Sequence, residues 1–315
     1  MLFEKWKGYT IERIGDKHYP EMAAIYGNVY KKSFMPGYFQ KKYATEHLGI
    51  KNIGCIAFTD KREPVATFLA IPWAFQYKSA QYLTTQSCDS ATDPHHTGKG
   101  LSTRLGICTY ELAKQENLLS TFGCPNQNSY HVLIGKLGWK VTTPLVRYTI
   151  PVGTLPLSGI TGKIGLKKQY MQFVHHIFNT YRIPPVSFNS METDDGLMVL
   201  RNEPYLQYKS GLGNFFIQIY ETIFWIKIVA NSLVIGDLKT THEHEWKKAM
   251  KKLKWLCLKA GLRYIYFQSQ KGSSEASYFS AHYREAASLQ VGYLDFKSGL
   301  PLDQLKVTFA DLDTF

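Results

Sequence analysis

The first half of the chain alternates between segments with strand-like and helix-like hydrophobic patterns. Short apolar runs bounded by turn residues predict strands, and apolar residues recurring every three or four positions predict helices. The predicted strands are 9–13, 53–59, 64–72, 80–92, 118–123, 139–142 and 146–150. The predicted helices are 19–31, 36–47, 100–117 and 128–137. This alternation predicts a mixed, twisted α/β sheet flanked by helices.

The second half follows a similar order of elements. Its predicted strands are 196–200, 214–220, 223–229, 232–238, 264–268, 293–296 and 307–312, and its predicted helices are 242–259 and 274–284. Between the halves, an amphipathic pattern predicts a further helix over 166–181. We therefore expect a domain at 1–151, a linker with an amphipathic helix at 152–185, and a second, similar domain at 186–315.

Composition and charge narrow the class of protein. The chain has 315 residues, 44% of them hydrophobic, which excludes global disorder. Its 37 Lys and Arg against 25 Asp and Glu give a net charge of +12. Such an excess favours an anionic partner, which includes a phosphorylated cofactor, an acidic substrate, nucleic acid or an anionic membrane surface. The most apolar stretch, 215–236, is interrupted by polar residues, so we expect buried strands there and no transmembrane segment.

Cysteine usage and the first residues point to the cytoplasm. The five cysteines are an odd number without a close pair, so we expect reduced and mostly buried thiols. Met1 to Trp6 lacks the cationic and apolar pattern of a cleaved secretory signal. His95 and His96 have no third ligand at a suitable spacing, and we expect no metal site.

A glycine-rich turn carries the clearest chemical signal. Thr97-Gly98-Lys99-Gly100 lies between a predicted strand and a predicted helix that begins at Leu101 and Ser102. Glycine lets the backbone approach a ligand closely, and the first amides of a helix have no partner within the helix. Together with the helix dipole and Lys99, they favour a phosphate or pyrophosphate. The alternative is an ordinary tight turn, and the spacing matches neither a Walker A loop nor a Rossmann fingerprint.

Two sequence elements within 1–151 resemble the GNAT N-acyltransferases. Residues 94–102 read Pro-His-His-Thr-Gly-Lys-Gly-Leu-Ser, similar to that family's cofactor-binding pattern of Arg or Gln, two variable residues, Gly, one variable residue, and Gly or Ala. At a suitable distance follow Gly123-Cys124-Pro125-Asn126 and then Lys136-Leu137-Gly138-Trp139, which resemble the family's Pro-Asn step and Leu-Gly-aromatic ending.

The resemblance implies the GNAT fold and binding of acetyl-CoA as co-substrate. It implies that backbone amides of the turn hold the CoA pyrophosphate, namely those of Gly98, Gly100, Leu101 and Ser102. It further implies that the strand end at Ala91 and Thr92 pairs with the pantetheine arm, and that Asn126 contacts the pantetheine or the adjacent backbone. Thr97 departs from the pattern, because it stands where the family prefers Arg or Gln, and Ser102 stands where Gly or Ala is usual.

The catalytic groups are less clearly marked. Many relatives place a tyrosine acid where this chain has Ile134, and Tyr130, one turn earlier on the same helical face, is the candidate substitute. Asp89 is the candidate base, since Gln86 stands near the position where some relatives have a glutamate. For Tyr130, the competing interpretation is a packed or surface tyrosine. For Asp89, it is a structural carboxylate on the strand face opposite Gln86. Tyr38 and Phe34 are expected to border the acceptor pocket.

These features predict an acetyl-CoA-dependent N-acetyltransferase acting on a primary amine of a small metabolite, such as an amino sugar, sugar nucleotide or amino-acid-like acceptor. The alternatives are a Fem-type aminoacyltransferase using aminoacyl-tRNA and a non-catalytic acyl-CoA-binding module. Nucleic acid is not the expected partner. The second half has no glycine turn before its helix and resembles the degenerate half of tandem GNAT proteins, so we expect it to lack a CoA pyrophosphate loop. Its lysine-rich helix, with Lys247 to Lys254, is interpreted as a solvated face.

Overall fold

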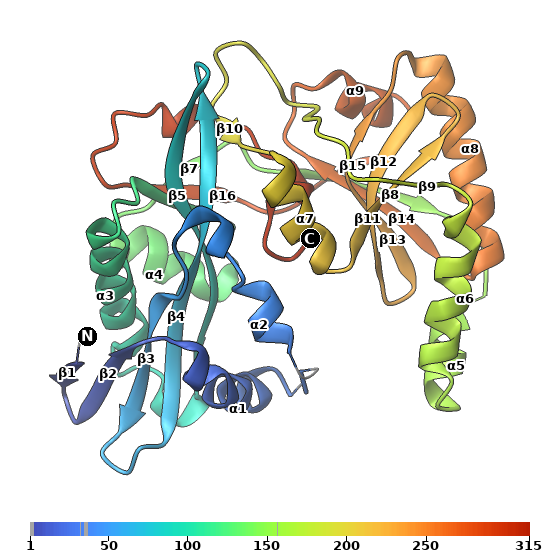
Figure 1. Ribbon diagram of the computed structural model, residues 1–315. Helices are drawn as coiled ribbons and strands as arrows, with labels where there is room; N and C mark the ends of the chain where they lie inside the picture. Colours follow the sequence, from blue (N-terminus) through green and yellow to red (C-terminus); the bar gives the residue numbers. More distant parts are fainter. Residues whose placement is uncertain (1–2, 32, 35–36, 156) are drawn as a thin grey trace. The chain divides into compact units, whose positions relative to one another are not determined.

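The computed structural model divides the chain into two compact units. It describes residues 3–31, 33–34, 37–155 and 157–315. The first unit runs to Thr142 and includes 195–200 and 289–305, and the second comprises 143–194, 201–288 and 306–315. Each unit is built on its own sheet with helices packed against it, as Figure 1 shows.

The first sheet has the order β1-β2-β3-β4-β5-β6-β16-β7, and β10 pairs with β4 off this path. The strands are β1 (Phe3–Trp6), β2 (Tyr9–Arg13), β3 (Ile53–Thr59), β4 (Pro64–Tyr77), β5 (Ala80–Thr92), β6 (Ser120–Gly123), β7 (Lys140–Thr142), β10 (Met198–Val199) and β16 (Val291–Asp295). Neighbouring strands are antiparallel except β5 and β6, which are parallel. The connection between two parallel strands must cross over, and here it contains a helix, α3 (Leu101–Gln115).

Helices cover both faces of the first sheet. Cys55 and Ala57 of β3 pack with α3 and with α4 (Gln127–Leu137), whereas Ile56 and Phe58 pack with α1 (Tyr19–Tyr30) and α2 (Tyr38–Lys42). Successive side chains of a strand point to opposite faces, so β3 contributes to two apolar layers. This sandwich fixes the carboxyl end of β5 between the two helical layers.

The second sheet has the order β15-β8-β14-β13-β12-β11-β9. Its strands are β8 (Val146–Pro151), β9 (Arg182–Ile183), β11 (Asn214–Ile219), β12 (Thr222–Val229), β13 (Ser232–Lys239), β14 (Tyr264–Ser269) and β15 (Glu285–Ala287). One face forms a core with α6 (Lys167–Asn179), α8 (Glu243–Ala260) and α9 (Ser274–Ser280). Beyond the opposite face, Tyr205 of α7 (Glu203–Gly211) packs edge-on against Trp225 of β12.

The two units repeat one order of elements. β13 and β14 are parallel, as β5 and β6 are, and α8 connects them as α3 connects the first pair. The predicted fold class, a mixed twisted sheet flanked by helices in two similar halves, is confirmed. Strands predicted over 215–236 are buried as β11, β12 and β13.

Several predicted boundaries and elements differ from the structure. The boundary expected after residue 151 differs from the observed division, because β8 pairs with β14 and β15 of the second sheet, and β16 conversely inserts between β6 and β7 of the first. The strand predicted over 307–312 is wrong. Thr308 and Asp311 form a capping box there, which starts the 3-10 turn Phe309–Asp311.

The helix predicted over 36–47 is observed as the short α2 and a 3-10 turn at Glu46–Leu48, and its first predicted residue lies outside the described residues. The helix α5 (Leu157–Lys163), the helix α7 and the strands β1, β9 and β15 were not predicted.

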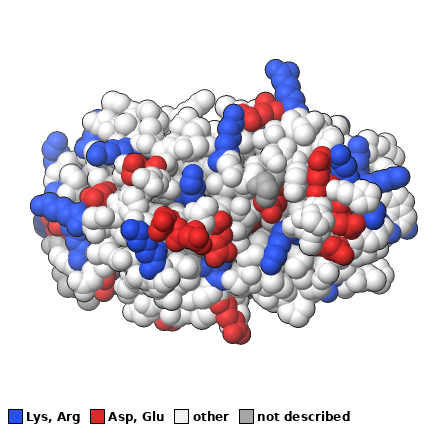
Figure 2. All heavy atoms as spheres, turned by 90° about the horizontal axis from the view of Figure 1, so that it is seen from above, with Lys and Arg blue, Asp and Glu red and all other residues white. Residues whose placement is uncertain are grey.

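The state and burial of the cysteines agree with the prediction from the sequence. All five cysteines are free thiols. Four of them are buried and Cys124 is half-buried, as predicted. On the face shown in Figure 2, acidic and basic side chains are interspersed. Among the described residues, no helix has both the length and the apolar character that a membrane crossing requires.

Candidate functional site

The glycine-rich turn forms a short, exposed loop between β5 and α3. Asp93 begins it by accepting a hydrogen bond from the His95 amide at 3.0 Å, which starts the 3-10 turn Pro94–His96. The same hydrogen bond is the main reason that the pKa of Asp93 is lowered. Gly98 and Gly100 then adopt φ of 75° and 84°, the left-handed region that disfavours side chains. The loop geometry therefore depends on these two glycines.

The helix that follows begins without a side-chain cap. Gly100 is its N-cap residue, and no side-chain hydrogen bond caps the first turn in this described part of the chain. A methyl group at Gly100 would lie 3.2 Å from the ring of Trp6, so a side chain there requires a small shift of that ring in addition to a strained φ. Thr97, Lys99 and Gly100 are exposed, Ser102 is half-buried and Leu101 is buried. Backbone amides at such a helix start form an electropositive site that fits a phosphate group.

Thr97 takes part in the loop's own structure. Its hydroxyl donates to the carbonyl oxygen of Pro94 at 2.9 Å. The loop is also tied to β2, since the Tyr9 hydroxyl lies 2.9 Å from Nδ1 of His96. Thr97 therefore stabilises the turn.

The end of β5 presents an open edge. β5 and β6 are paired at Thr85–Thr121 and Gln86–Phe122, and among the described strands this pairing does not continue towards Thr92. On its other edge, β5 stays paired with β4 through Ala91 and Thr92. An extended ligand can add itself to an unpaired strand edge through backbone hydrogen bonds. Ala91 and Thr92 lie on that segment.

A β-bulge interrupts β5 at Asp89. Thr67 lies opposite Ala91 and Leu69 opposite Cys88, so Asp89 and Ser90 together face the single residue between them on β4. Asp89 has a φ of 44°. The Tyr26 hydroxyl donates to the Asp89 carbonyl oxygen at 2.6 Å, which ties the bulge to α1. The bulge changes the direction of the Asp89 side chain, so strict alternation along β5 does not apply at this residue.

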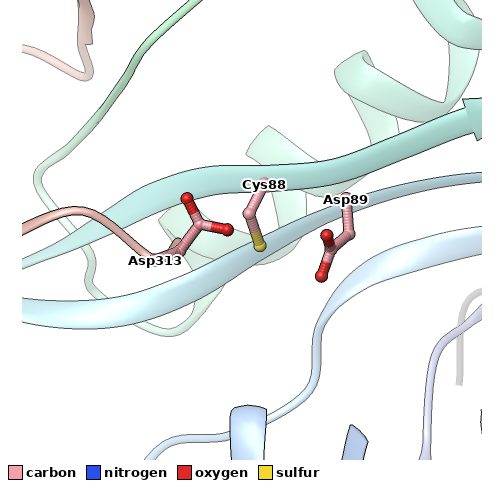
Figure 3. A group of neighbouring side chains, drawn as sticks. All are labelled: Cys88, Asp89 and Asp313. Carbon is pink, nitrogen blue, oxygen red and sulfur yellow. The ribbon is translucent and has the colours of Figure 1, made fainter. Parts of the chain in front are cut away.

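The carboxylate of Asp89 is held by two residues of the α2 region. Its Oδ2 lies 2.7 Å from Nζ of Lys42 and accepts a hydrogen bond of 2.6 Å from the Tyr43 hydroxyl. Burial is the main cause that raises the pKa of Tyr43, and the charge of Asp89 raises it further, so Tyr43 remains a protonated donor. Figure 3 shows Asp89 next to Cys88 on β5; Asp313, also labelled there, belongs to the second unit.

Aromatic side chains surround this position on α1 and α2. Phe34 packs against Tyr26, Tyr38 and Phe39, with ring centroids 5.2 to 5.8 Å apart. Tyr38 is exposed and Phe34 is half-buried. Tyr38 and Phe34 are predicted from the sequence to lie here, whereas Lys42, Tyr43 and Tyr26 are not. The sequence gives no signal that separates Lys42 from its neighbour Lys41, since both lie within the predicted helix 36–47.

Asn126 and Tyr130 lie on the second helix of the site. Asn126 is the N-cap of α4, and its Oδ1 accepts hydrogen bonds of 2.9 Å from the amides of Asn128 and Ser129. Its side-chain oxygen is therefore engaged with the adjacent backbone. Tyr130 is exposed in the first turns of α4. Because α3 and α4 follow the carboxyl ends of two parallel neighbours, β5 and β6, their N-termini lie at the same edge of the sheet.

Taken unit by unit, the described residues contain no group of three His, Cys, Asp or Glu side chains close enough together to hold an ion. The donors of the loop, which are amides and a lysine, suit an anion instead.

Comparisons with known proteins bear on the fold. No family model and no curated protein matches the sequence. Among solved structures, Saccharomyces cerevisiae N-myristoyltransferase with bound myristoyl-CoA aligns over 98% of this chain and 85% of its own, with a TM-score of 0.57 and 10% identity.

Two bacterial structures give similar values. A probable N-acyltransferase from Enterococcus faecalis aligns over 92% of this chain and 73% of its own, with a TM-score of 0.57 and 12% identity. A GCN5-related N-acetyltransferase from Kribbella flavida aligns over 90% of this chain and 70% of its own, with a TM-score of 0.53 and 11% identity. At these identities the likeness concerns the fold, and the chain has the mixed α/β fold of these N-acyltransferase structures.

Proposed function

We propose that the chain is an acyl-CoA-dependent N-acyltransferase that transfers an acetyl group to a primary amine of a small metabolite. The observation that carries this proposal is the position of Gly98 and Gly100. Two glycines with positive φ precede an uncapped helix at the carboxyl edge of the β5–β6 pair, next to an open strand edge. The glycine turn before the helix suits a pyrophosphate, and the open strand edge suits an extended amide chain. CoA contains both groups. The fold shared with N-acyltransferase structures supports the same proposal.

The proposed binding mode uses mostly backbone groups. The amides of Gly98, Gly100, Leu101 and Ser102 bind the pyrophosphate, and Lys99 adds a positive charge at the exposed rim. Ala91 and Thr92 pair with the pantetheine arm. Asn126 contributes by fixing the start of α4 beside that arm, since its side chain caps the helix.

The proposed chemistry assigns Asp89 and Tyr130 to proton transfer. The amine nitrogen attacks the thioester carbonyl, Asp89 accepts the proton that the amine loses, and the carbon–sulfur bond breaks. Tyr130 donates a proton to the departing thiolate. Oδ2 of Asp89 is engaged by Lys42 and Tyr43, which leaves Oδ1 as the proton acceptor. The aromatic residues Phe34 and Tyr38 border the acceptor.

We further propose that the second unit binds no second CoA. Its corresponding connection, between β13 and α8, consists of residues 240–242 and contains no glycine, and α8 begins directly after His242. The same segment in the first unit is eight residues long, 93–100. Calorimetry should therefore give a stoichiometry of one CoA per chain, and a value of two would refute this part.

Turnover measurements test the assignment of the chemistry. Thiol release is measured with acetyl-CoA and longer acyl-CoA thioesters against a panel of amino sugars, sugar nucleotides and amino acids. Tyr130→Phe and Asp89→Asn should each lower kcat by roughly 10²-fold or more, the usual contribution of a general acid or base, with CoA affinity unchanged. Tyr220→Phe, at an exposed tyrosine of the second unit, is the matched control. CoA binding without turnover of any amine would favour a non-catalytic module, and preference for a long acyl chain would overturn the acetyl assignment.

A further inference from the structure

Two segments of the second unit contain no acidic residue. Residues 151–191 include four Lys and Arg, residues 246–274 include eight, and neither segment has an Asp or Glu. Their combined twelve cations equal the net charge of +12 of the whole chain. The segments contain α5, α6 and most of α8. This segregation contrasts with the interspersed charges on the face of Figure 2.

The same segments expose large apolar side chains. Leu155 and Ile164 are 69% and 62% exposed, the two highest values among the described exposed large hydrophobic residues. Five more belong to the same two segments, namely Ile160, Leu166, Phe173, Trp255 and Leu258. Single exposed apolar residues are normal on a protein surface, but a group of them marks an interaction site.

Contacts within the second unit bring these residues to one surface. α5 packs on α6, and α6 packs on α8. The side chain of Leu157 packs against Gly261 at the end of α8, and the Thr154 hydroxyl donates to the carbonyl oxygen of Leu258 at 3.4 Å. The exposed residues that flank Leu157 therefore lie beside the C-terminal end of α8. Figure 1 shows α5 and α6 following one another along the side of the second sheet.

Cationic groups surround the apolar ones. Nζ of Lys259 lies 3.8 Å and Nζ of Lys252 lies 4.3 Å from the ring centroid of Trp255. A cavity of about 530 Å³ opens on α5 and α6, and its lining includes Lys163, Lys167 and Tyr170. A tryptophan with adjacent lysines is typical of a segment that lies at the boundary between lipid headgroups and acyl chains.

We propose that this surface, formed by α5, α6 and the C-terminal half of α8, binds the surface of an anionic lipid bilayer. Leu155, Ile160, Ile164, Trp255 and Leu258 enter the boundary below the headgroups. Lys163, Lys167, Lys168, Lys252 and Lys259 contact lipid phosphates, and the cavity between α5 and α6 accepts a headgroup. The chain lies on the membrane in this mode and does not cross it.

Charge and polarity together favour a bilayer over other occupants. Nucleic acid would satisfy the lysines but leave the aliphatic side chains exposed. A second copy of this chain would cover the aliphatic side chains but bring two surfaces of the same charge together. An anionic bilayer satisfies both sets of groups.

Vesicle sedimentation tests the proposal. The full-length protein is mixed with vesicles of phosphatidylcholine alone or with 30% phosphatidylglycerol, at low and high salt. Binding should require the anionic lipid and weaken with salt. Lys167→Glu with Lys168→Glu should weaken binding by roughly 25-fold or more, since each lysine near an anionic surface contributes about fivefold. Lys61→Glu, in a turn of the first unit, is the matched control and should change little.

The apolar contribution is tested separately. Ile164→Asp should weaken vesicle binding strongly, whereas Val141→Asp, at a comparably exposed residue of the first unit, should not. Trp255 should show a blue shift of its fluorescence on vesicles that Trp255→Phe removes. Circular dichroism and thermal melting confirm that each variant folds.

Absence of binding to anionic vesicles at low salt would overturn the proposal. Binding that Ile164→Asp leaves unchanged would also overturn it, because the surface would then be a general polyanion site. A concentration-dependent dimer that Ile164→Asp abolishes and vesicles do not displace would identify a second copy as the occupant. None of these outcomes affects the CoA site, which lies in the first unit.

Discussion

Arg201 is a buried charge that links three segments of the second unit. All five of its N–H donors are used. Nε and Nη2 contact the two oxygens of Asp311 at 2.9 Å, Nη1 contacts Asp237 and the Phe188 carbonyl oxygen, and Nη2 also contacts Thr308 at 2.7 Å. Asp237 and Asp311 are 0% exposed. One guanidinium thus joins β13, the segment before β10 and the C-terminal segment of the chain.

Replacing Arg201 with methionine should destabilise the fold severely. The substitution removes the guanidinium that pairs with Asp237 and Asp311, and removing one partner of a buried ion pair costs about 3–5 kcal/mol. Because domains are stable by only about 5–15 kcal/mol, the loss is a large fraction of the free energy of unfolding. Arg201→Lys should recover only part of it, since an ammonium group cannot reproduce the planar, bidentate contact with Asp311.

Urea denaturation followed by circular dichroism measures the loss in the free energy of unfolding. The pH dependence of this free energy provides a second test. Burial already raises the pKa of Asp237 in the presence of Arg201. In Arg201→Met, the folded state should bind more protons than the unfolded state, so stability should fall as pH rises above the ordinary carboxyl pKa of about 3.9. Arg182→Met, at an exposed arginine of the same unit, is the control. A loss below about 1 kcal/mol for Arg201→Met would refute this reasoning.

Three further substitutions test other parts of the structure. Burial lowers the pKa of Lys209 to about 7, so between pH 7 and 9 the unfolded chain holds a proton that the folded chain lacks. The free energy of unfolding should therefore rise over this range by up to ~1.4 kcal/mol per pH unit. Lys209→Met should flatten this pH dependence in urea titrations, and an unchanged pH dependence would contradict the assignment. Gly54→Ala should cost about 1–3 kcal/mol, because its methyl group would lie 2.8 Å from the Phe68 carbonyl oxygen of β4, whereas Gly15→Ala, with open space around it, should melt like the parent. Asn126→Ala should cost about 1 kcal/mol by removing the cap of α4, and a melting temperature equal to that of the parent would show that the cap contributes nothing.

Local patterns predicted most elements but not how the strands pair across the sequence. The helical spacing before Gly138 and the glycine itself correctly placed the end of α4, because helix ends depend on neighbouring residues. The insertion of β16 between β6 and β7 depends instead on pairing with residues more than 140 positions away. No hydrophobic periodicity encodes such a strand register. The domain boundary expected after residue 151 differs from the observed division for the same reason.

The candidate site shows the same division. Positive φ at Gly98 and Gly100 was predictable, since glycine before a helix is a local signal. The ion pair between Lys42 and Asp89 was not, because it joins residues of two elements that only the folded sheet brings together. Regular alternation along β5 would place Asp89 and Gln86 on opposite faces, but the bulge at Asp89 breaks that alternation.

CoA binding by the parent and by Gly100→Asp tests the central proposal most directly. Isothermal titration calorimetry should show binding of CoA to the parent and a loss of at least tenfold in affinity for Gly100→Asp, which places a carboxylate at the proposed pyrophosphate site. Gly49→Asp is the matched control, because Gly49 also has a positive φ, of 72°, and lies in another loop of the first unit. Equal CoA affinity of Gly100→Asp and the parent would contradict the assignment of the loop, and with it the proposed acyltransferase function.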